Sequence, residues 1–228
     1  MVVSTTSWAA VAELVASNPD VVHATNTRLV QELERQTRTI PIVFANIADP
    51  VDTGVAASLA HPGGNATGFQ NIEPAIGGKW LELLKEVAPD VSRVLVMANW
   101  GNDANQSILR VIEASAPSFG VHLTSVAVRD AAEIESAIEA VAREPNAGLI
   151  VIAGLPINDR RKLIFALAAR YRLPAVYMFR YFTIDGGLMS YGADELDIHR
   201  RSAAYVARIL KGEKPSDLPV QAPVKYEL

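Results

Sequence analysis

The stretch Ala147-Gly-Leu-Ile-Val-Ile-Ala153 decides the fold class. A short, uninterrupted apolar run of this kind is typical of a strand that is buried inside a protein. An amphipathic helix is predicted after it, over 159–171, and a further apolar strand over 174–178. Because a strand, a helix and a strand in this order form a βαβ unit, the sequence predicts a parallel sheet flanked by helices.

The same alternation of strands and helices extends along most of the chain. Further strands are predicted over 20–24, 40–45, 66–69, 93–98 and 121–126. Further helices are predicted over 28–36, 49–59, 104–115, 131–143 and 195–210, together with one that carries Trp80 and ends at Pro89. This series predicts an α/β fold.

Two stretches rich in glycine and proline divide this series, one at 61–76 and the other at 185–192. Two sheets joined by more than one crossing segment would explain both breaks. One continuous sheet would also allow them, so the pattern leaves both arrangements open.

Composition excludes several classes of protein. The chain has 228 residues, of which half are hydrophobic, and carries a net charge of −4, which does not suit a surface that binds nucleic acid. It has no cysteine, so disulfides, thiolate metal sites and cysteine nucleophiles are excluded. No apolar run approaches the roughly 20 residues of a membrane-spanning helix. We expect no direct membrane insertion and find no signal-peptide pattern at the first residues.

No motif for catalysis or for a cofactor stands out. The glycine-rich stretch 62–68 does not match the dinucleotide or P-loop patterns, and no G-x-S-x-G elbow is present. The four histidines are scattered without metal-ligand spacing. We therefore predict no catalytic residue, no metal and no cofactor.

Amide, hydroxyl and aromatic side chains recur where the predicted strands end, which is where open parallel sheets bind ligands. The residues of these kinds are Thr25, Asn26, Thr27, Asn46, Asn99, Trp100, Asn102, Asn105, Asn158, Tyr181 and Phe182, and Asp49 and Leu155 also follow strands. Such a set can hydrogen-bond and stack a small polar or aromatic ligand. Asparagine and threonine are equally good helix caps and turn formers, so this alternative stays open for each residue alone.

Three acidic residues, Asp194, Glu195 and Asp197, fall at the start of the helix predicted over 195–210. The helix macrodipole stabilises negative charge at that end. This explanation suffices at the level of the sequence, so no ligand contact is predicted for them.

Several longer stretches resemble one family. They are Ile40-Pro-Ile-Val-Phe-Ala-Asn-Ile-Ala-Asp-Pro-Val51, Ala57-Ser-Leu-Ala-His-Pro-Gly-Gly-Asn-Ala-Thr-Gly68, Lys79-Trp-Leu-Glu-Leu-Leu-Lys85, Gly187-Leu-Met-Ser-Tyr-Gly192 and Tyr205-Val-Ala-Arg-Ile-Leu-Lys-Gly-Glu-Lys-Pro215. Together they resemble the substrate-binding proteins of ABC transporters, in the branch whose members take up aromatic amino acids.

The resemblance implies a two-lobed periplasmic-binding-protein fold of type I. Lobe one would comprise residues 1–70 and 190–220, lobe two residues 71–189, and a returning hinge segment residues 221–228. A small ligand, aromatic or amino-acid-like, would be trapped between the lobes by hinge closure. The resemblance further implies a periplasmic protein that partners ABC permease subunits. Family members usually carry one more strand and helix before this chain's first residues and continue past Leu228, so lobe one is expected to be incomplete at its N-terminus.

The resemblance also suggests which residues contact the ligand. They are Thr25, Thr27, Asn46 and Asp49 in lobe one, Trp100, Asn102, Leu155 and Asp185 in lobe two, and Thr67 and Gly68 on the hinge side. Asp49 or Asp185 would receive an ammonium group, and Trp100 or Phe182 would stack on an aromatic ring. The alternatives are a ligand-sensing domain of a regulator and, ranked below it, an enzyme on a doubly wound α/β sheet.

Overall fold

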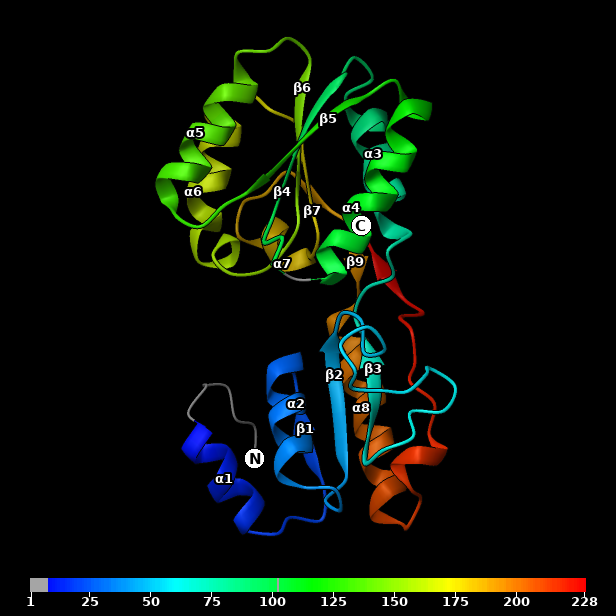
Figure 1. Cartoon of the computed structure of the whole chain (residues 1–228). Helices are drawn as coiled ribbons and strands as arrows, with labels where there is room; N and C mark the ends of the chain where they lie inside the picture. Colours follow the sequence, from blue (N-terminus) through cyan, green and yellow to red (C-terminus); the bar gives the residue numbers. More distant parts are fainter. Residues whose placement is uncertain (1–7, 102) are drawn as a thin grey trace. The chain divides into compact units, whose positions relative to one another are not determined.

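The computed structural model describes residues 8–101 and 103–228. Its contacts divide the chain into two compact units (Figure 1). Unit 1 comprises Met1–Glu73 and Ala193–Lys225, and unit 2 comprises Pro74–Gly192 and Tyr226–Leu228. The chain therefore passes from one unit to the other three times.

Unit 1 contains a parallel sheet of three strands in the order β1 (Val22–Ala24), β2 (Ile42–Ile47) and β3 (Ala66–Gln70). Its helices are α1 (Trp8–Ala16), α2 (Thr27–Gln36) and α8 (Glu195–Leu210), followed by the 3-10 turn η2 (Pro215–Asp217). Ile42 and Phe44 belong to the same hydrophobic cluster as residues of α1 and α2. Because side chains alternate along a strand, Val43 points to the opposite face, and α8 packs against β2 and β3 there. Both faces of the sheet are covered, as a parallel sheet requires.

Unit 2 contains a parallel sheet of five strands in the order β5 (His122–Ala127), β4 (Arg93–Ala98), β6 (Ala147–Val151), β7 (Ala175–Tyr177) and β8 (Met189–Ser190). The helices α3 (Ile76–Val87) and α4 (Asp103–Ser115) pack together on one face, and α5 (Ala131–Ala142) and α6 (Ile157–Arg170) on the other (Figure 1). A 3-10 turn η1 (Ala116–Phe119) follows α4, and α7 (Arg180–Ile184) follows β7. All residues of β6 are buried, which agrees with its apolar sequence.

A two-stranded ribbon forms where the chain passes between the units. Strand β9 (Gly192–Ala193) pairs with β10 (Tyr226–Glu227). Next to this pair, the backbone N–H of Asp194 donates to the carbonyl of Lys225 at 2.9 Å, and the Lys225 ammonium donates to the Asp194 carboxylate at 2.5 Å. Main-chain and side-chain bonds thus hold the second and third crossings together.

The predicted α/β class, with parallel sheets flanked by helices, is confirmed, and the strands form two separate parallel sheets. The helix predicted over 49–59 is wrong, because that segment folds as turns. Asp49 closes the first turn through its side chain, and Gly54, at φ +73°, takes the left-handed conformation that ends the run. Helices α1 and α7 and the ribbon β9–β10 were not predicted. None of the described helices is both long and apolar enough to cross a membrane.

Candidate functional site

In unit 1, Asn46 lies at the carboxyl end of β2, where the backbone leaves regular strand geometry. The pairing of β2 with β3 shifts between Phe44 and Ile47, and Asn46 has a φ of +59°. Asparagine tolerates this left-handed conformation better than most residues, and a bulge redirects the side chain. The Nδ2 atom of Asn46 donates to Nε2 of His199 at 3.1 Å, whereas its Oδ1 is buried and accepts from no described residue. Asn46 is therefore a polar group only half satisfied within unit 1.

Two histidines and a serine extend this polar region between the sheet and α8. His23 is on β1, and His199 and Ser202 are on α8. The rings of His23 and His199 lie 5.7 Å apart, and Nε2 of His23 is 3.1 Å from Oγ of Ser202. Because Ser202 donates its own proton to the carbonyl of His199, its oxygen accepts from His23. Burial, with a smaller contribution from His199, lowers the pKa of His23, which favours the neutral ring. This pair was not predicted, since nothing in the spacing of β1 and α8 along the sequence brings their histidines together.

Glu195 is one helical turn before His199 on α8 and was also not predicted as a ligand contact. Its side chain is partly buried, and this burial raises the pKa of its carboxyl group. It takes part in none of the ion pairs formed by the described residues. Unit 1 therefore contains a carboxylate that has no cationic partner among residues 8–101 and 103–228.

Of the other residues of unit 1 expected to contact a ligand, Thr25 and Thr27 are partly buried, whereas Asp49 is hydrogen-bonded within its own turn. Thr25 and Thr27 are partly buried on either side of Asn26, whose side chain caps α2 by accepting from the N–H of Leu29 at 2.9 Å. One carboxylate oxygen of Asp49 accepts from the N–H groups of the two residues that follow its neighbour Pro50, at 3.2 and 3.0 Å. The Asp49 side chain thus stabilises the turn that it begins.

Thr67 and Gly68 have structural roles in β3. Thr67 is 0% exposed, and its hydroxyl donates to the carbonyl of Leu218 at 2.6 Å. A Cβ atom on Gly68 would lie 2.0 Å from the carbonyl oxygen of Phe44, so the close approach of β3 to β2 requires glycine there. These contacts explain both residue types without a ligand.

In unit 2, Trp100 and Leu155 follow adjacent strands, β4 and β6, at the same edge of the sheet. The Nδ2 atom of Asn99 donates to the carbonyl of Leu155 at 3.2 Å and so joins the two loops. Amides of α4 hold the first loop, because Asn105 donates to the carbonyl of Asn99 and Gln106 to that of Trp100, both at 2.9 Å. Nε1 of Trp100 is buried and donates to no described residue. The Leu155 side chain is exposed.

Three other residues of unit 2 were expected to contact a ligand. Asp185 forms an ion pair, Phe182 lies in the core, and Asn102 is not among the described residues. Asp185 accepts from Nε of Arg161 at 2.6 Å, so its charge is already compensated. The ring of Phe182 is 0% exposed and stacks on Tyr177 with centroids 5.5 Å apart, which places it in the core. Asn102 lies outside the described residues.

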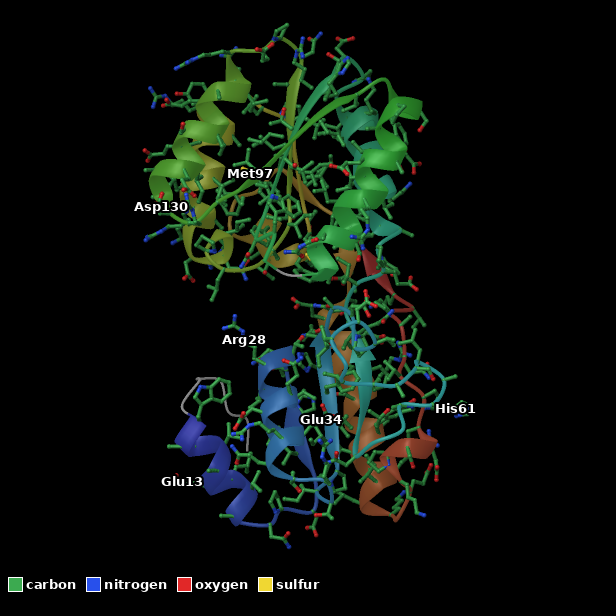
Figure 2. All side chains as sticks on the ribbon, in the orientation of Figure 1. Glu13, Arg28, Glu34, His61, Met97 and Asp130 are labelled. Carbon is green, nitrogen blue, oxygen red and sulfur yellow. The ribbon has the colours of Figure 1, made fainter. Side chains whose placement is uncertain are left out.

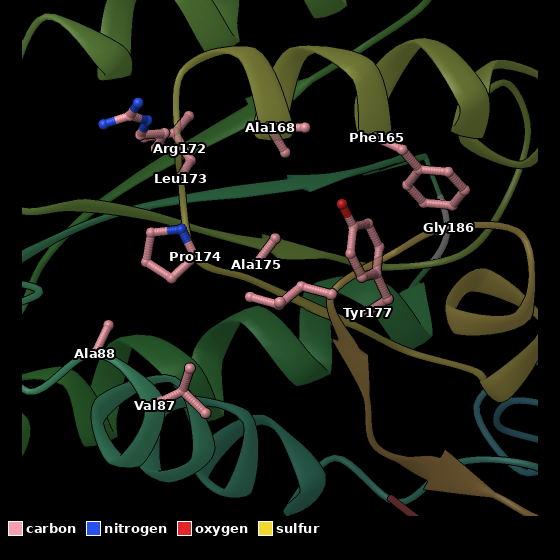
Figure 3. A pocket seen from close by; sticks show the side chains of 12 residues that line it. Val87, Ala88, Phe165, Ala168, Arg172, Leu173, Pro174, Ala175, Tyr177 and Gly186 are labelled. Carbon is pink, nitrogen blue, oxygen red and sulfur yellow. The ribbon is translucent and has the colours of Figure 1, made fainter.

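A cavity of about 420 Å³ also lies in unit 2, beside β7 (Figure 3). It is lined by apolar side chains from the last turns of α3 and α6, among them Val87 and Ala168, and by Tyr177. Neither Trp100 nor Leu155 lines it. Within residues 8–101 and 103–228, no cluster of histidine and acidic side chains could hold a metal ion.

A sequence model of the ABC transporter substrate binding protein family matches residues 3–228. The chain belongs to this family. The family predicted from the sequence is thereby confirmed.

The chain is also similar to three individual proteins. A tyrosine-binding protein of Clostridioides difficile is 23% identical over 221 residues, and the match includes 94% of this chain and 61% of that protein. The crystal structure of a conserved domain protein from Vibrio cholerae is 28% identical with a TM-score of 0.85, over 96% of this chain and 73% of that one. An ABC domain from Streptococcus pneumonia, solved in complex with L-Trp, is 25% identical with a TM-score of 0.82, over 96% and 76%. The chain thus spans about three-fifths of the length of its curated relative.

Proposed function

We propose that this chain is the solute-binding component of an ABC importer and that its ligand is an aromatic amino acid. The observation that carries the proposal is the agreement of two relatives found by separate comparisons, one a tyrosine-binding protein and the other solved in complex with L-Trp. Its role is to capture the ligand unchanged and deliver it to permease subunits on the outer side of the membrane, and not to catalyse a reaction.

The chemistry of the strand ends supports such a ligand. An aromatic amino acid needs a surface for its ring and polar partners for its ammonium and carboxylate groups. Trp100 in unit 2 offers an indole that can stack on a ring, and aromatic pairs add about 0.5–1.5 kcal/mol beyond area burial. Thr25, Thr27 and Asn46 in unit 1 offer hydroxyl and amide groups near the carboxyl ends of β1 and β2. We propose that these residues and Leu155 contact the ligand, whereas Thr67 and Gly68 support the sheet.

Calorimetric titration of the purified chain tests this function. We expect saturable 1:1 binding of L-Trp, L-Tyr or L-Phe, and no heat of binding with D-glucose or L-Asp at the same concentrations. At a ligand concentration of 100 times Kd, a specific ligand stabilises the folded chain by about 2.7 kcal/mol, so the same ligands raise Tm. The bound amino acid should be recovered chemically unchanged. Binding of sugars in preference to aromatic amino acids, or conversion of the ligand, would contradict the proposal.

A further inference from the structure

The direction of α8 across the sheet of unit 1 places Glu195 at the carboxyl ends of the strands. Ser202 of α8 contacts His23, which pairs with Val43 in the sheet, whereas His199 contacts Asn46 at the far end of β2. Movement toward the start of α8 is therefore movement toward the carboxyl ends of β1 and β2. Since one helical turn rises 5.4 Å, Glu195 lies one turn beyond the level of His199.

The helix face that carries Glu195 is the face turned toward β1 and β2. Residues 195, 199 and 202 follow the i, i+4, i+7 spacing of a single helix face, and the last two make the contacts with Asn46 and His23. The opposite flank of α8 faces β3, where Arg201 lies over the ring of Phe69 with its Cζ 5.0 Å from the ring centroid. This arginine is thus on the flank away from Glu195.

Glu195 is the acidic group of unit 1 that best fits a cationic ligand group. Burial raises the pKa of its carboxyl group, and it forms none of the ion pairs found among the described residues. Its neighbour Asp194 is held by Lys225, and Asp49 accepts from two backbone N–H groups. Oδ1 of Asn46, next to His199, is a second acceptor without a donor in the described chain. An ammonium group has three donors and would satisfy both acceptors.

We propose that Glu195, together with Asn46, receives the ammonium group of the bound ligand and so selects amines over uncharged or purely anionic molecules. This inference rests on the proposed function, because it assigns one part of an amino-acid ligand to one carboxylate. In the free protein burial disfavours the charged form of this carboxylate more than the start of α8 favours it, and a bound cation offsets the difference. Glu195 therefore lowers the stability of the free protein and raises its affinity for an amine ligand.

The test compares Glu195→Gln with Glu13→Gln, an exposed glutamate on α1 of the same unit (Figure 2). Each protein is titrated with two ligand pairs that differ only in the amino group, L-Trp with indole-3-propionate and L-Leu with isocaproate. For the ligand pair that binds, we expect Glu195→Gln to lower the affinity for the amino acid by about tenfold or more, as for the loss of a charged hydrogen bond. The affinity for the analogue without the amino group should not change. Glu195→Gln should also raise the Tm of the free protein at pH 7, whereas Glu13→Gln should change neither quantity.

The outcomes separate this inference from the proposed function. If the wild type binds L-Trp but Glu195→Gln weakens both members of the pair equally, or neither, the role of Glu195 is overturned and the proposed function stands. If L-Leu binds, none of L-Trp, L-Tyr and L-Phe binds, and Glu195→Gln weakens L-Leu selectively, the role of Glu195 stands and the aromatic ligand is overturned. If neither pair binds to the wild type, and L-Tyr and L-Phe do not bind either, both are overturned. A fall in the Tm of free Glu195→Gln would also count against the role of Glu195.

Discussion

The carboxyl ends of the two sheets contain similar kinds of residue but leave different groups available. In unit 1, Oδ1 of Asn46 accepts from no described residue, and Glu195 forms none of the ion pairs found among the described residues. In unit 2, Asp185 is paired with Arg161, and the amides around Trp100 bond to the loops that carry it. Residue type at a strand end therefore does not decide what can bind there. The partners that tertiary packing supplies decide it, and they leave charge and amide groups in unit 1 and an indole in unit 2.

The largest effect is expected from Gly68→Ala in unit 1. Its Cβ would meet the carbonyl oxygen of Phe44, so β2 and β3 must separate directly before the bulge that carries Asn46. We expect a loss of about 3 kcal/mol or more in the free energy of unfolding, at the upper end of overpacking effects. The matched change in unit 2 is Gly154→Ala, which meets no atom within 4 Å and strains only the backbone at φ +146°, at a cost of about 1–3 kcal/mol. Denaturant unfolding that ranks Gly154→Ala as the more damaging change would reverse this part of the comparison.

Trp100→Ala tests whether unit 2 recognises the ring. We expect a loss of about 2 kcal/mol in binding free energy, or about 30-fold in Kd, for any aromatic amino acid that binds. Trp8→Ala is the control, because Trp8 is 49% exposed on α1 of unit 1 and should leave Kd unchanged. Equal losses in the two variants, measured by calorimetry, would show that Trp100 has no specific role.

Asn46→Gly tests the amide of unit 1 without straining the backbone. Glycine adopts the left-handed conformation of Asn46 freely, so the substitution removes the side chain and keeps the bulge. We expect an affinity loss of about tenfold, or 1.4 kcal/mol, for L-Trp. Asn46→Ala should lose the same affinity and also some stability, since alanine is strained at positive φ. Unchanged affinity in both variants would remove Asn46 from the ligand contacts.

The smallest effect concerns the Asp194–Lys225 pair beside the ribbon β9–β10. The hydrogen bond from Lys225, and then the backbone N–H of Asp197, hold the pKa of Asp194 below its usual 3.8. A lowered pKa in the folded state stabilises the protein above about pH 4, and this contribution is lost as the pH falls through the folded value. Asp194→Asn keeps the cap of α8 but removes the charge, so its Tm should be slightly lower than wild type at pH 7 and equal to it near pH 2. A difference in Tm that does not change with pH would contradict this electrostatic explanation.

Much of the fold was predictable from the sequence, because apolar periodicity marks buried strands such as 147–151 and amphipathic helices such as 195–210. The helix predicted over 49–59 failed because Asp49 and Gly54 favour turns that outweigh the weaker helical pattern. At the candidate site, Asn46 and Trp100 could be proposed from their places after strands. Glu195 could not, because the helix dipole explains its place in the first turn of α8. Only the fold shows that it is partly buried and outside the ion pairs of the described residues. The contact between His23 and His199 could not be predicted either, because β1 and α8 are far apart in the sequence and meet only in the fold.

One calorimetric experiment tests the central claim most directly. L-Trp and indole-3-propionate are titrated into wild type, Trp100→Ala and Glu195→Gln under identical conditions. If unit 2 recognises the ring and unit 1 recognises the ammonium group, Trp100→Ala weakens both ligands by the same factor and Glu195→Gln weakens only L-Trp. If the two variants weaken the two ligands in the same proportion, or if Glu195→Gln leaves L-Trp binding unchanged, this division of roles is contradicted.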